Sequence, residues 1–263
     1  MEACSRQSKP FLRLDGIDFS YYGSLGETKV LENINLTVER GEFVVLVGPS
    51  GCGKSTILSL ICGLLKPVNG FITFYSEDFS TPRIGYMLQH DHLLEWRDVY
   101  HNIMLGLEIQ KSKTPENLAF VDELLEKYRL SDFKRQKPSA LSGGMRQRIA
   151  LIRTLATRPD LLLLDEPFSA LDYQTRLNVS RDVRGIIKSE RKTAILVTHD
   201  ISEAIALGDT IYVLTKSPCR TKDRIAIEFE QNGIRRDEVR SSKLFQEYFD
   251  AIWREMQNEN TDI

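Results

Sequence analysis

Apolar and polar residues alternate along the first part of the chain. Apolar residues recur there at short intervals: Phe11, Leu12, Leu14, Ile17, Phe19, Val30, Leu31, Ile34, Leu36 and Val38. Such alternation is typical of strands that bury one face. The segment 42–47 is instead almost wholly apolar, which predicts a strand buried on both faces. A glycine-rich turn follows, and then a predicted helix at 54–65 that Gly63 and Pro67 end.

The rest of the chain divides into a helical stretch and an alternating stretch. Strands are predicted at 70–75 and 84–89, and the pattern from about 90 to 157 is mostly helical. Apolar residues recur in it at helical spacing: Leu118, Val121, Leu124, Leu125 and Tyr128. Strands at 161–165, 193–198 and 210–215 then alternate with helices at 173–190 and 201–207. This alternation is typical of a parallel βαβ sheet, and an amphipathic helix is predicted from about 241.

Composition limits the possible classes of protein. Of the 263 residues 41% are hydrophobic, and 35 lysines and arginines stand against 37 acidic residues. The apolar content is that of a folded protein, and the charge balance gives no overall attraction to nucleic acid or anionic lipid. The four cysteines, Cys4, Cys52, Cys62 and Cys219, form no CxxC pair. This argues against a disulfide scaffold or a zinc site and for a reducing compartment.

Neither a secretory signal nor a membrane span is expected. The N-terminal residues contain no apolar core of the kind that a signal peptide carries. The longest apolar runs, 43–47 and 161–164, have the length of strands, whereas a helix that crosses a bilayer needs about 20 apolar residues. Any role at a membrane is therefore predicted to be peripheral.

The turn after the 42–47 strand reads GPSGCGKST and fits the phosphate-loop pattern G-x-x-x-x-G-K-[ST]. The residues predicted to bind nucleotide are Gly48, Pro49, Ser50, Gly51, Cys52, Gly53, Lys54, Ser55 and Thr56. The glycines allow a tight turn whose N–H groups point at phosphate. Lys54 is expected to reach the β- and γ-phosphates and Ser55 to bind magnesium, while Cys52 is interpreted as small filler. The alternative, a glycine turn without a ligand, is disfavoured by the flanking strand and helix.

Two carboxylates follow the leucines of 161–164. In the sequence LLLLDEPFSALD, Asp165 ends the predicted strand and Glu166 comes next. Ligands gather at the carboxyl ends of strands in parallel sheets. Asp165 is therefore predicted to bind magnesium through water, and Glu166 to polarise an attacking water. The alternative is that the pair caps the next helix.

A third motif, LSGGMRQR at 141–148, resembles the signature sequence of ATP-binding-cassette (ABC) ATPases. Further motifs of that family are matched in order: Tyr21 or Tyr22 as the ring that stacks on adenine, Gln89 as the Q-loop glutamine, Ser169–Asp172 as the D-loop and His199 as the switch histidine. The resemblance covers roughly 11–220. It rests on the motifs themselves and not on composition or spacing.

The resemblance implies an α/β fold. It predicts a P-loop NTPase cassette with a RecA-like parallel sheet core, an antiparallel β subdomain and a helical subdomain. The ATPase domain is expected at 11–225, with the helical subdomain inserted at about 90–157. A C-terminal extension with the amphipathic helix is expected at 226–263, and the helix is expected to cover the sheet.

The resemblance also implies how the motifs act. In the family, the signature of one subunit closes over the nucleotide of its partner. Ser142, Gly143 and Gly144 would thus complete the partner's site in a head-to-tail homodimer that holds two ATP molecules. Asp172 is counted with these nucleotide-binding residues. That Ser142 also caps the following helix is a compatible interpretation.

Three residues are assigned catalytic roles on the same resemblance. Glu166 is the base, His199 contacts the γ-phosphate, and Gln89 contacts magnesium and the attacking water. The implied cofactors are ATP and Mg²⁺.

The chain resembles the importer branch of the family most. A single cassette, without a coiled-coil insert or membrane helices, implies a stand-alone importer subunit at the cytoplasmic face of the membrane. Integral-membrane permease subunits are its expected partners, and an extracytoplasmic substrate-binding protein serves it indirectly. The segment HDHLLEWRDVYHNI resembles the nitrate, sulfonate and taurine importer group. Glu95 replaces the usual proline, as in relatives proposed to import thiamine-pyrimidine precursors.

Two questions stay open at this point. Leu93, Leu94 and Trp96 are predicted to form a socket for a permease helix with Glu95 at its rim, and packing inside the helical subdomain is equally open. The alternative function is a non-transport ABC ATPase that acts on nucleic acid or a protein complex. A basic stripe or a coiled-coil insert would favour it. The sequence has neither, so no nucleic-acid partner is expected.

Overall fold

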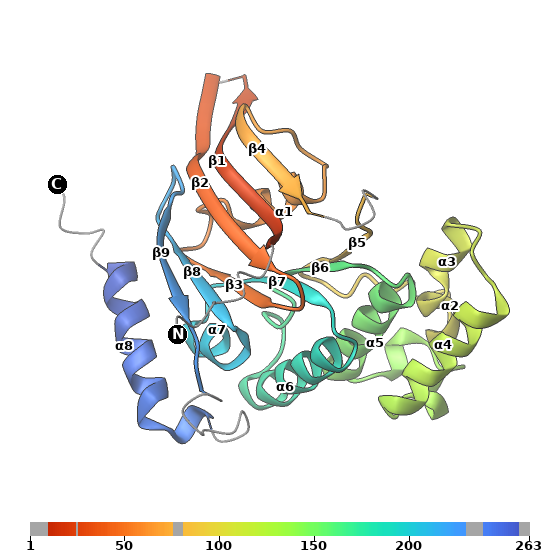
Figure 1. Ribbon diagram of the computed structural model, residues 1–263. Coiled ribbons are helices and arrows are strands. Elements are labelled where there is room, and N and C mark those ends of the chain that lie inside the picture. The colour runs from red at the N-terminus through yellow and green to blue at the C-terminus, as the bar shows by residue number, and fades with distance from the viewer. Residues whose placement is uncertain (1–9, 25, 76–80, 230–238, 258–263) are drawn as a thin grey trace, which may run out of the picture. The chain divides into compact units, whose positions relative to one another are not determined.

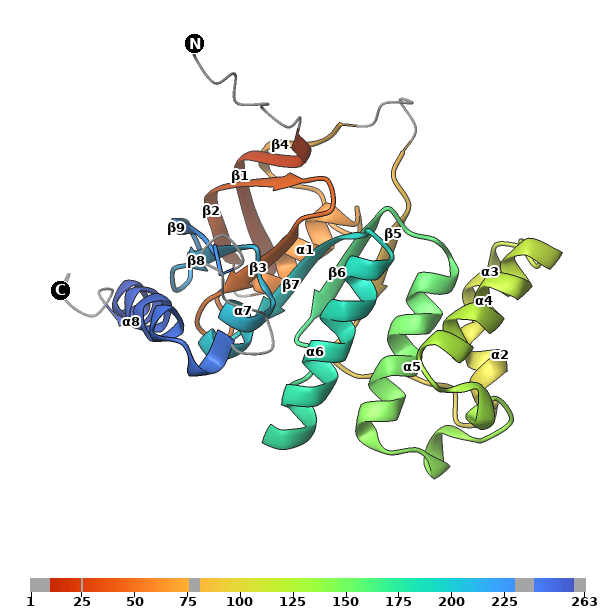
Figure 2. The ribbon, with the colours of Figure 1, turned by 60° about the horizontal axis from the view of Figure 1, so that its bottom comes forward.

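The computed structural model describes residues 10–24, 26–75, 81–229 and 239–257. Cys4 and the last six residues lie outside this range. The chain forms two compact units: the first comprises 1–82 and 193–263, and the second comprises 83–192 (Figures 1 and 2). The predicted limits of the ATPase domain, 11–225, come from the family resemblance, whereas the two units are defined by their compactness. The domain limits therefore stay a prediction.

The first unit contains an antiparallel sheet built from the N-terminal alternating segment. Its strands, in the order β2-β1-β4, are β1 (Pro10–Gly23), β2 (Gly26–Glu39) and β4 (Asn69–Phe74). Leu14 pairs with Leu36 on one side and with Ile72 on the other. Leu14 and Leu36 are buried, whereas Phe71 is 76% exposed. The predicted one-sided burial of these strands is therefore confirmed.

The first unit also contains the parallel strands that surround the glycine-rich turn. These are β3 (Phe43–Val47), β7 (Thr193–Thr198) and β8 (Thr210–Leu214). β3 lies between β7 and β8, and every residue of the three strands is buried. The predicted burial on both faces is confirmed. The antiparallel strand β9 (Thr221–Ala226) pairs with β8 and was not predicted, because its sequence TKDRIA is too polar to stand out.

Three helices of the first unit accompany these strands. They are α1 (Lys54–Ile61), α7 (Ile201–Leu207) and α8 (Lys243–Gln257). The predicted helix at 54–65 thus ends four residues early. α8 packs against α7 and β8 and buries Phe245 and Ile252, in agreement with its expected role as a cover.

The second unit combines a parallel strand pair with a group of helices. β5 (Ile84–Met87) pairs with β6 (Leu161–Asp165). The helices are α2 (Val99–Ile103), α3 (Leu105–Ile109), α4 (Pro115–Lys127), α5 (Gly143–Ala156) and α6 (Tyr173–Ser189), with single 3-10 turns at Ser131–Phe133 and Pro138–Ala140. All four other helices contact α5, and Figure 2 shows it flanked by α4 and α6. The prediction of a mostly helical stretch at 90–157 is confirmed.

In the part of the chain that the structure describes, no helix is both long and apolar enough to span a membrane.

Candidate functional site

The glycine-rich turn lies in the first unit, between the carboxyl end of β3 and the start of α1. Gly53 has a φ of +120°, a backbone conformation that side-chain-bearing residues rarely adopt. A Cβ at this position would lie 2.8 Å from Leu31 Cδ2 and 2.9 Å from Val30 Cγ1. Both the backbone angle and the close approach of β2 therefore require glycine here. The predicted strand–loop–helix context of a phosphate loop is present.

The lysine of this loop is held by the loop itself. Lys54 is only 4% exposed. Its Nζ donates hydrogen bonds to Gly48 O at 2.9 Å and to Pro49 O at 2.8 Å. Two neutral carbonyls thus hold the ammonium group at the loop, where the negative oxygens of a phosphate would bind it more strongly. Ser55, at the start of α1, is exposed.

The structure distinguishes the two aromatic rings that are candidates for stacking on adenine. Tyr21 is 46% exposed, packs edge-on against Phe19, and its hydroxyl lies 3.4 Å from Oγ1 of Thr56 in the phosphate-loop motif. Tyr22 is 72% exposed, and its hydroxyl donates to Glu27 instead. The Tyr21 hydroxyl contacts the phosphate-loop motif and the Tyr22 hydroxyl contacts Glu27, so the geometry favours Tyr21 as the ring beside the nucleotide.

His199 lies at the same sheet edge as the phosphate loop. β3 and β7 are parallel neighbours, and Val47 pairs with Thr198. Gly48 and His199 directly follow these paired residues, so both stand at the carboxyl ends of adjacent strands, where ligands bind in parallel sheets. His199 is exposed, and the next residue, Asp200, caps α7 by accepting a hydrogen bond from Glu203 N.

The carboxylates of the second unit also stand at a strand end. Asp165 closes β6, is 9% exposed and accepts a hydrogen bond of 3.1 Å from the Tyr86 hydroxyl. Glu166 is half-buried and has a φ of +42°. A positive φ in a residue other than glycine is strained, and such strain is concentrated at functional sites. The contact of Asp165 with the Tyr86 hydroxyl is one that the sequence did not indicate.

Gln89 lies near the backbone of Glu166. Met87 pairs with Leu164, so each of the two residues comes two positions after a paired one. Gln89 Nε2 donates to Ser169 Oγ at 3.4 Å, and Ser169 Oγ donates to Glu166 O at 2.9 Å. The structure thus connects the predicted Q-loop, catalytic and D-loop positions within one unit.

The signature residues begin α5. Ser142 accepts a hydrogen bond of 3.3 Å from Met145 N, so the interpretation of Ser142 as a helix cap is confirmed. A Cβ on Gly144 would lie 2.8 Å from Val179 Cγ2 of α6, so this glycine lets the two helices approach. Ser142 remains exposed.

Asp172 caps the neighbouring helix α6. Its carboxylate accepts a 3.1 Å hydrogen bond from Thr175 N. Hydrogen bonds from the Thr175 side chain and backbone lower the pKa of Asp172 below its usual value. The structure thus shows a capping role for Asp172, and its predicted contact with nucleotide stays a proposal.

The predicted socket separates into a buried and an exposed part. Leu93 is 7% exposed and Trp96 is 73% exposed. Packing inside the second unit therefore accounts for Leu93 but not for Trp96. The segment 91–97 is called the Trp96 loop below.

The side chains that hold the Trp96 loop were missed by sequence reasoning. Asn102 is fully buried; its Oδ1 accepts from Leu94 N at 2.7 Å, and its Nδ2 donates to the carbonyls of Leu94, Arg97 and Asp98. Arg153 of α5 donates to the carbonyls of Asp91 and His92 at 2.6 and 2.8 Å. A polar asparagine among the apolar residues of 99–107 was the available signal.

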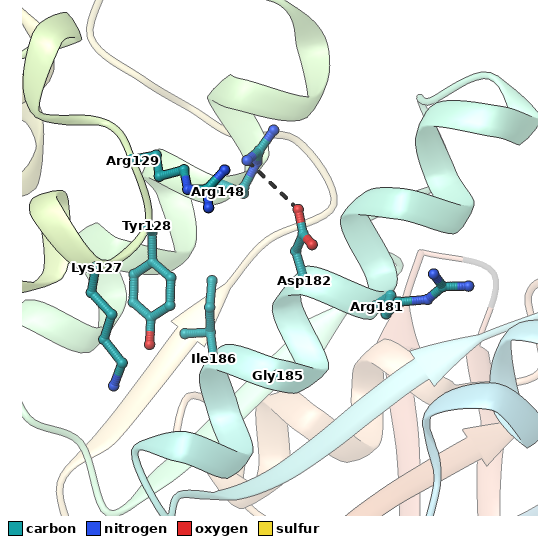
Figure 3. A pocket seen from close by; sticks show the side chains of 8 residues that line it. All are labelled: Lys127, Tyr128, Arg129, Arg148, Arg181, Asp182, Gly185 and Ile186. Atoms are coloured by element: carbon teal, nitrogen blue, oxygen red, sulfur yellow. Dashed lines mark ion pairs between the residues drawn. The ribbon is translucent and has the colours of Figure 1, made fainter. Parts of the chain in front are cut away.

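A separate cavity of about 400 Å³ lies between α4, α5 and α6 in the second unit (Figure 3). Its cationic lining is partly neutralised, since Arg148 pairs with Asp182 at 3.6 Å and Lys127 pairs with Glu190 at 2.6 Å. None of the predicted nucleotide-binding or catalytic residues lines it. Among the described residues, no cluster of three or more histidine, cysteine or acidic side chains suited to holding a metal is present either.

Comparison with known proteins identifies the family. A family model described as "ABC transporter" matches residues 31–169. An uncharacterized ABC transporter ATP-binding protein of Bacillus subtilis, YtlC, is 42% identical over 94% of this chain and 95% of its own length. The chain belongs to the ABC transporter family. It is therefore an ATPase, as the resemblance predicted.

One further relative of this ABC ATPase and one solved structure indicate the importer group and the fold. An aliphatic sulfonates import ATP-binding protein of Bacillus licheniformis is 39% identical over 89% of this chain and 90% of its own. The solved dimeric structure of a post-hydrolysis state of the ATP-binding cassette MJ0796, bound to ADP and Pi, is 31% identical and covers 82% of this chain and 98% of its own, with a TM-score of 0.68. The predicted α/β cassette fold and the resemblance to the sulfonate importer group are confirmed.

Proposed function

We propose that this ATPase energises an importer and drives uptake of a small solute through a separate integral-membrane permease. The use of ATP is supported by the phosphate loop at the β3–α1 junction with its buried, pre-positioned Lys54, and the import role by similarity to the sulfonate import ATP-binding protein. Similarity to the sulfonate import protein supports a substrate of the nitrate, sulfonate and taurine class. An extracytoplasmic substrate-binding protein would deliver that solute, and the ATPase would work at the cytoplasmic face of the membrane.

In the proposed site, the phosphate loop binds ATP and Tyr21 packs on the adenine. Lys54 exchanges the carbonyls of Gly48 and Pro49 for phosphate oxygens. The residues assigned to magnesium, Ser55, Gln89 and Asp165, offer only oxygen donors, the ligands that Mg²⁺ prefers. When bound, the ion would neutralise charge on the phosphates.

The catalytic step of hydrolysis is assigned to the carboxylate of Glu166. Glu166 accepts the proton of the attacking water on a carboxylate oxygen, which raises the nucleophilicity of that water. Gln89 orients the same water, and His199 donates a hydrogen bond to the γ-phosphate.

The working form is proposed to be a head-to-tail homodimer. Ser142, Gly143 and Gly144 stand at the N-terminus of α5, where backbone N–H groups favour an anion. They would complete the site of the partner copy together with Asp172. Ser142→Arg should then abolish turnover while monomer ATP affinity stays within about twofold, since the lesion acts on the partner's nucleotide.

Mixed subunits test this arrangement. In a heterodimer of Lys54→Ala and Ser142→Arg chains, one site carries both changes and the other carries neither. Part of the turnover should therefore return on mixing two inactive variants. If no activity returns although heterodimers form, the head-to-tail arrangement is wrong.

Transport itself is tested in vesicles. The chain is reconstituted with a candidate permease and substrate-binding protein from the same organism, and uptake of labelled sulfonate, taurine or nitrate is measured with ATP inside. Uptake should depend on ATP and vanish with Lys54→Ala. ATP hydrolysis that no permease stimulates and no uptake follows would contradict the importer role.

A further inference from the structure

Two cysteines of the first unit lie together beside the phosphate loop. Cys52 belongs to the loop and is 2% exposed, while Cys219 follows β8 and is fully buried. A side-chain hydrogen bond with Cys219 is the largest of the effects that lower the pKa of the Cys52 thiol. Cys62 comes directly after α1 and is only half-buried. The chain therefore contains a thiol pair at the loop and a third thiol nearby that serves as a matched control.

Backbone contacts that do not involve the thiols bring the same segments together. Cys219 N donates to Val30 O at 2.8 Å, and Glu32 N donates to Cys219 O at 2.9 Å. Gly53, the neighbour of Cys52, packs so closely on Val30 and Leu31 that it has no room for a Cβ. The start of β2 is thus in contact with both the phosphate loop and the segment that carries Cys219. The segment that carries Cys219 and the residue after Cys52 therefore contact the same part of β2.

The environment of Cys52 favours its reactive form. The hydrogen bond with Cys219 and, against the effect of burial, the charge of Lys54 lower the pKa of the Cys52 thiol from 9.0 to about 7. The thiolate is the species that reacts with oxidants and disulfides. A resolving thiol next to a low-pKa, accessible cysteine is typical of redox-sensitive sites. Cys52 lies between the exposed Gly51 and the half-buried Gly53, so the access of an oxidant to its sulfur depends on movement of the loop.

We propose that Cys52 and Cys219 form a reversible disulfide that switches off nucleotide binding at the phosphate loop, an inference that rests on the proposed role of this loop. The oxidant is a peroxide. The Cys52 thiolate attacks one oxygen of hydrogen peroxide, the O–O bond breaks, and a sulfenic acid and hydroxide form. The Cys219 sulfur then attacks the sulfenic sulfur and expels the hydroxyl group, and with two protons the products are one disulfide and two waters.

The disulfide alters the loop because it shortens the distance between the sulfurs. An S–S bond is about 2.05 Å long, much less than the separation of two hydrogen-bonded thiols. Cys52 stands between Gly51 and Gly53, so the shift falls on the row of N–H groups that binds phosphate. A displacement of about 1 Å in a positioned site costs about a hundredfold in rate. Bound ATP covers the exposed flank at Ser50 and Gly51 and is expected to protect the pair.

The experiment compares ATP binding before and after oxidation. The full chain is treated with hydrogen peroxide, with and without MgATP. Affinity for a fluorescent ATP analogue and ATP turnover are then measured, and linked peptides are identified by mass spectrometry. Turnover should fall about a hundredfold, dithiothreitol should restore it, and MgATP should prevent the loss. The linked peptides should contain Cys52 and Cys219.

Two variants isolate the pair. Cys219→Ala should bind ATP normally when reduced and should form no disulfide at Cys52 after peroxide. Because the variant also loses the hydrogen bond that lowers the pKa of Cys52, its Cys52 should react with peroxide more slowly, and turnover should fall more slowly than in the unaltered chain. Cys62→Ala should remain as sensitive as the unaltered chain. A loss of turnover in Cys219→Ala that is as fast and as large as in the unaltered chain would overturn the proposal, as would a cysteine other than Cys219 linked to Cys52. Should Cys219→Ala fail to fold, the peptide map of the unaltered chain decides alone.

These outcomes separate the switch from the underlying function. If the reduced chain binds no ATP, the proposed function of the loop fails. If the reduced chain binds ATP and the fully oxidised chain binds it equally well, only the switch fails.

Discussion

The phosphate loop and the Trp96 loop are both turns at strand ends, but they are built in different ways. The phosphate loop is shaped by its own residues: Gly53 at a φ of +120°, and Lys54 bonded to two carbonyls of the same loop. The Trp96 loop is shaped from outside by Asn102 of α2 and Arg153 of α5. One loop is a local structure, and the other depends on how the helices pack.

This difference decides what a sequence reveals. A local loop needs particular residue types at consecutive positions, so its motif can be recognised in the sequence before any fold is known. A loop held by distant side chains leaves no consecutive pattern, because the Asn102 and Arg153 that fix it are far apart in the sequence. The two loops should also respond differently to substitution, since one affects ligand binding and the other stability.

Of the substitutions in the two loops, Gly53→Ala is expected to have the largest effect, and the quantity to measure is ATP affinity. Backbone strain and the contacts with Val30 and Leu31 together cost about 2–4 kcal/mol. If the loop relieves this cost by moving its phosphate-binding N–H groups, ATP affinity falls by up to about 30- to 1,000-fold, as measured by equilibrium titration; if the loop keeps its shape, the cost appears in the free energy of unfolding instead. The control is Gly63→Ala, which also has a positive φ but open space around it and lies outside the loop. Equal losses in both variants would contradict the role of the close approach.

Asn102→Ala should show the opposite behaviour. The buried carbonyls of Leu94, Arg97 and Asp98 and the N–H of Leu94 lose their partner. The free energy of unfolding should fall by about 3 kcal/mol, as measured by urea denaturation. Glu123→Ala, on the exposed face of α4, is the control and should change it by less than about 0.5 kcal/mol. A comparably small loss for Asn102→Ala would show that the Trp96 loop does not depend on this side chain.

Trp96→Ala is expected to leave the fold intact and weaken docking. Trp96 is 73% exposed, so the free energy of unfolding should change by less than about 0.5 kcal/mol. If Trp96 anchors a permease helix, association should weaken by about 2 kcal/mol, about 30-fold in affinity. Binding to the permease in detergent measures this. If association is unaltered, Trp96 has no docking role; if the variant unfolds, Trp96 belongs to the core.

The smallest effect concerns the acidity of the phosphate-loop thiol. The rate of Cys52 alkylation by iodoacetamide should rise with pH through about 7 and then level off, because the thiolate is the reactive form and its pKa is about 7. Cys219→Ala removes the hydrogen bond that lowers this pKa, so the rise should move to higher pH. An identical pH profile in the variant would contradict the contact between the two thiols.

Sequence patterns predicted the strands and helices that bury continuous or evenly spaced apolar residues. The predicted strands 42–47, 161–165 and 193–198 and the predicted helix 201–207 match the structure closely. The polar edge strand β9 and the early end of α1 were not predicted, because edge pairing and helix ends depend on neighbours that the local sequence does not specify.

The same limit applies to the candidate site. The phosphate loop, Asp165, Glu166 and the signature were found from consecutive motifs. The choice of Tyr21 over Tyr22 needed the contact with Thr56, and the bond from Tyr86 to Asp165 needed the pairing of β5 with β6. Such contacts join residues far apart in the chain, so they became visible only with the structure.

The central claim is that this chain hydrolyses ATP held on the phosphate loop with Glu166 as the base. The direct measurement is ATP binding and steady-state turnover of Glu166→Gln, which keeps the shape of the side chain but accepts no proton. Binding should be retained while turnover falls by roughly two to four orders of magnitude, and the variant should accumulate as an ATP-bound dimer. Near-normal turnover by Glu166→Gln would contradict the account.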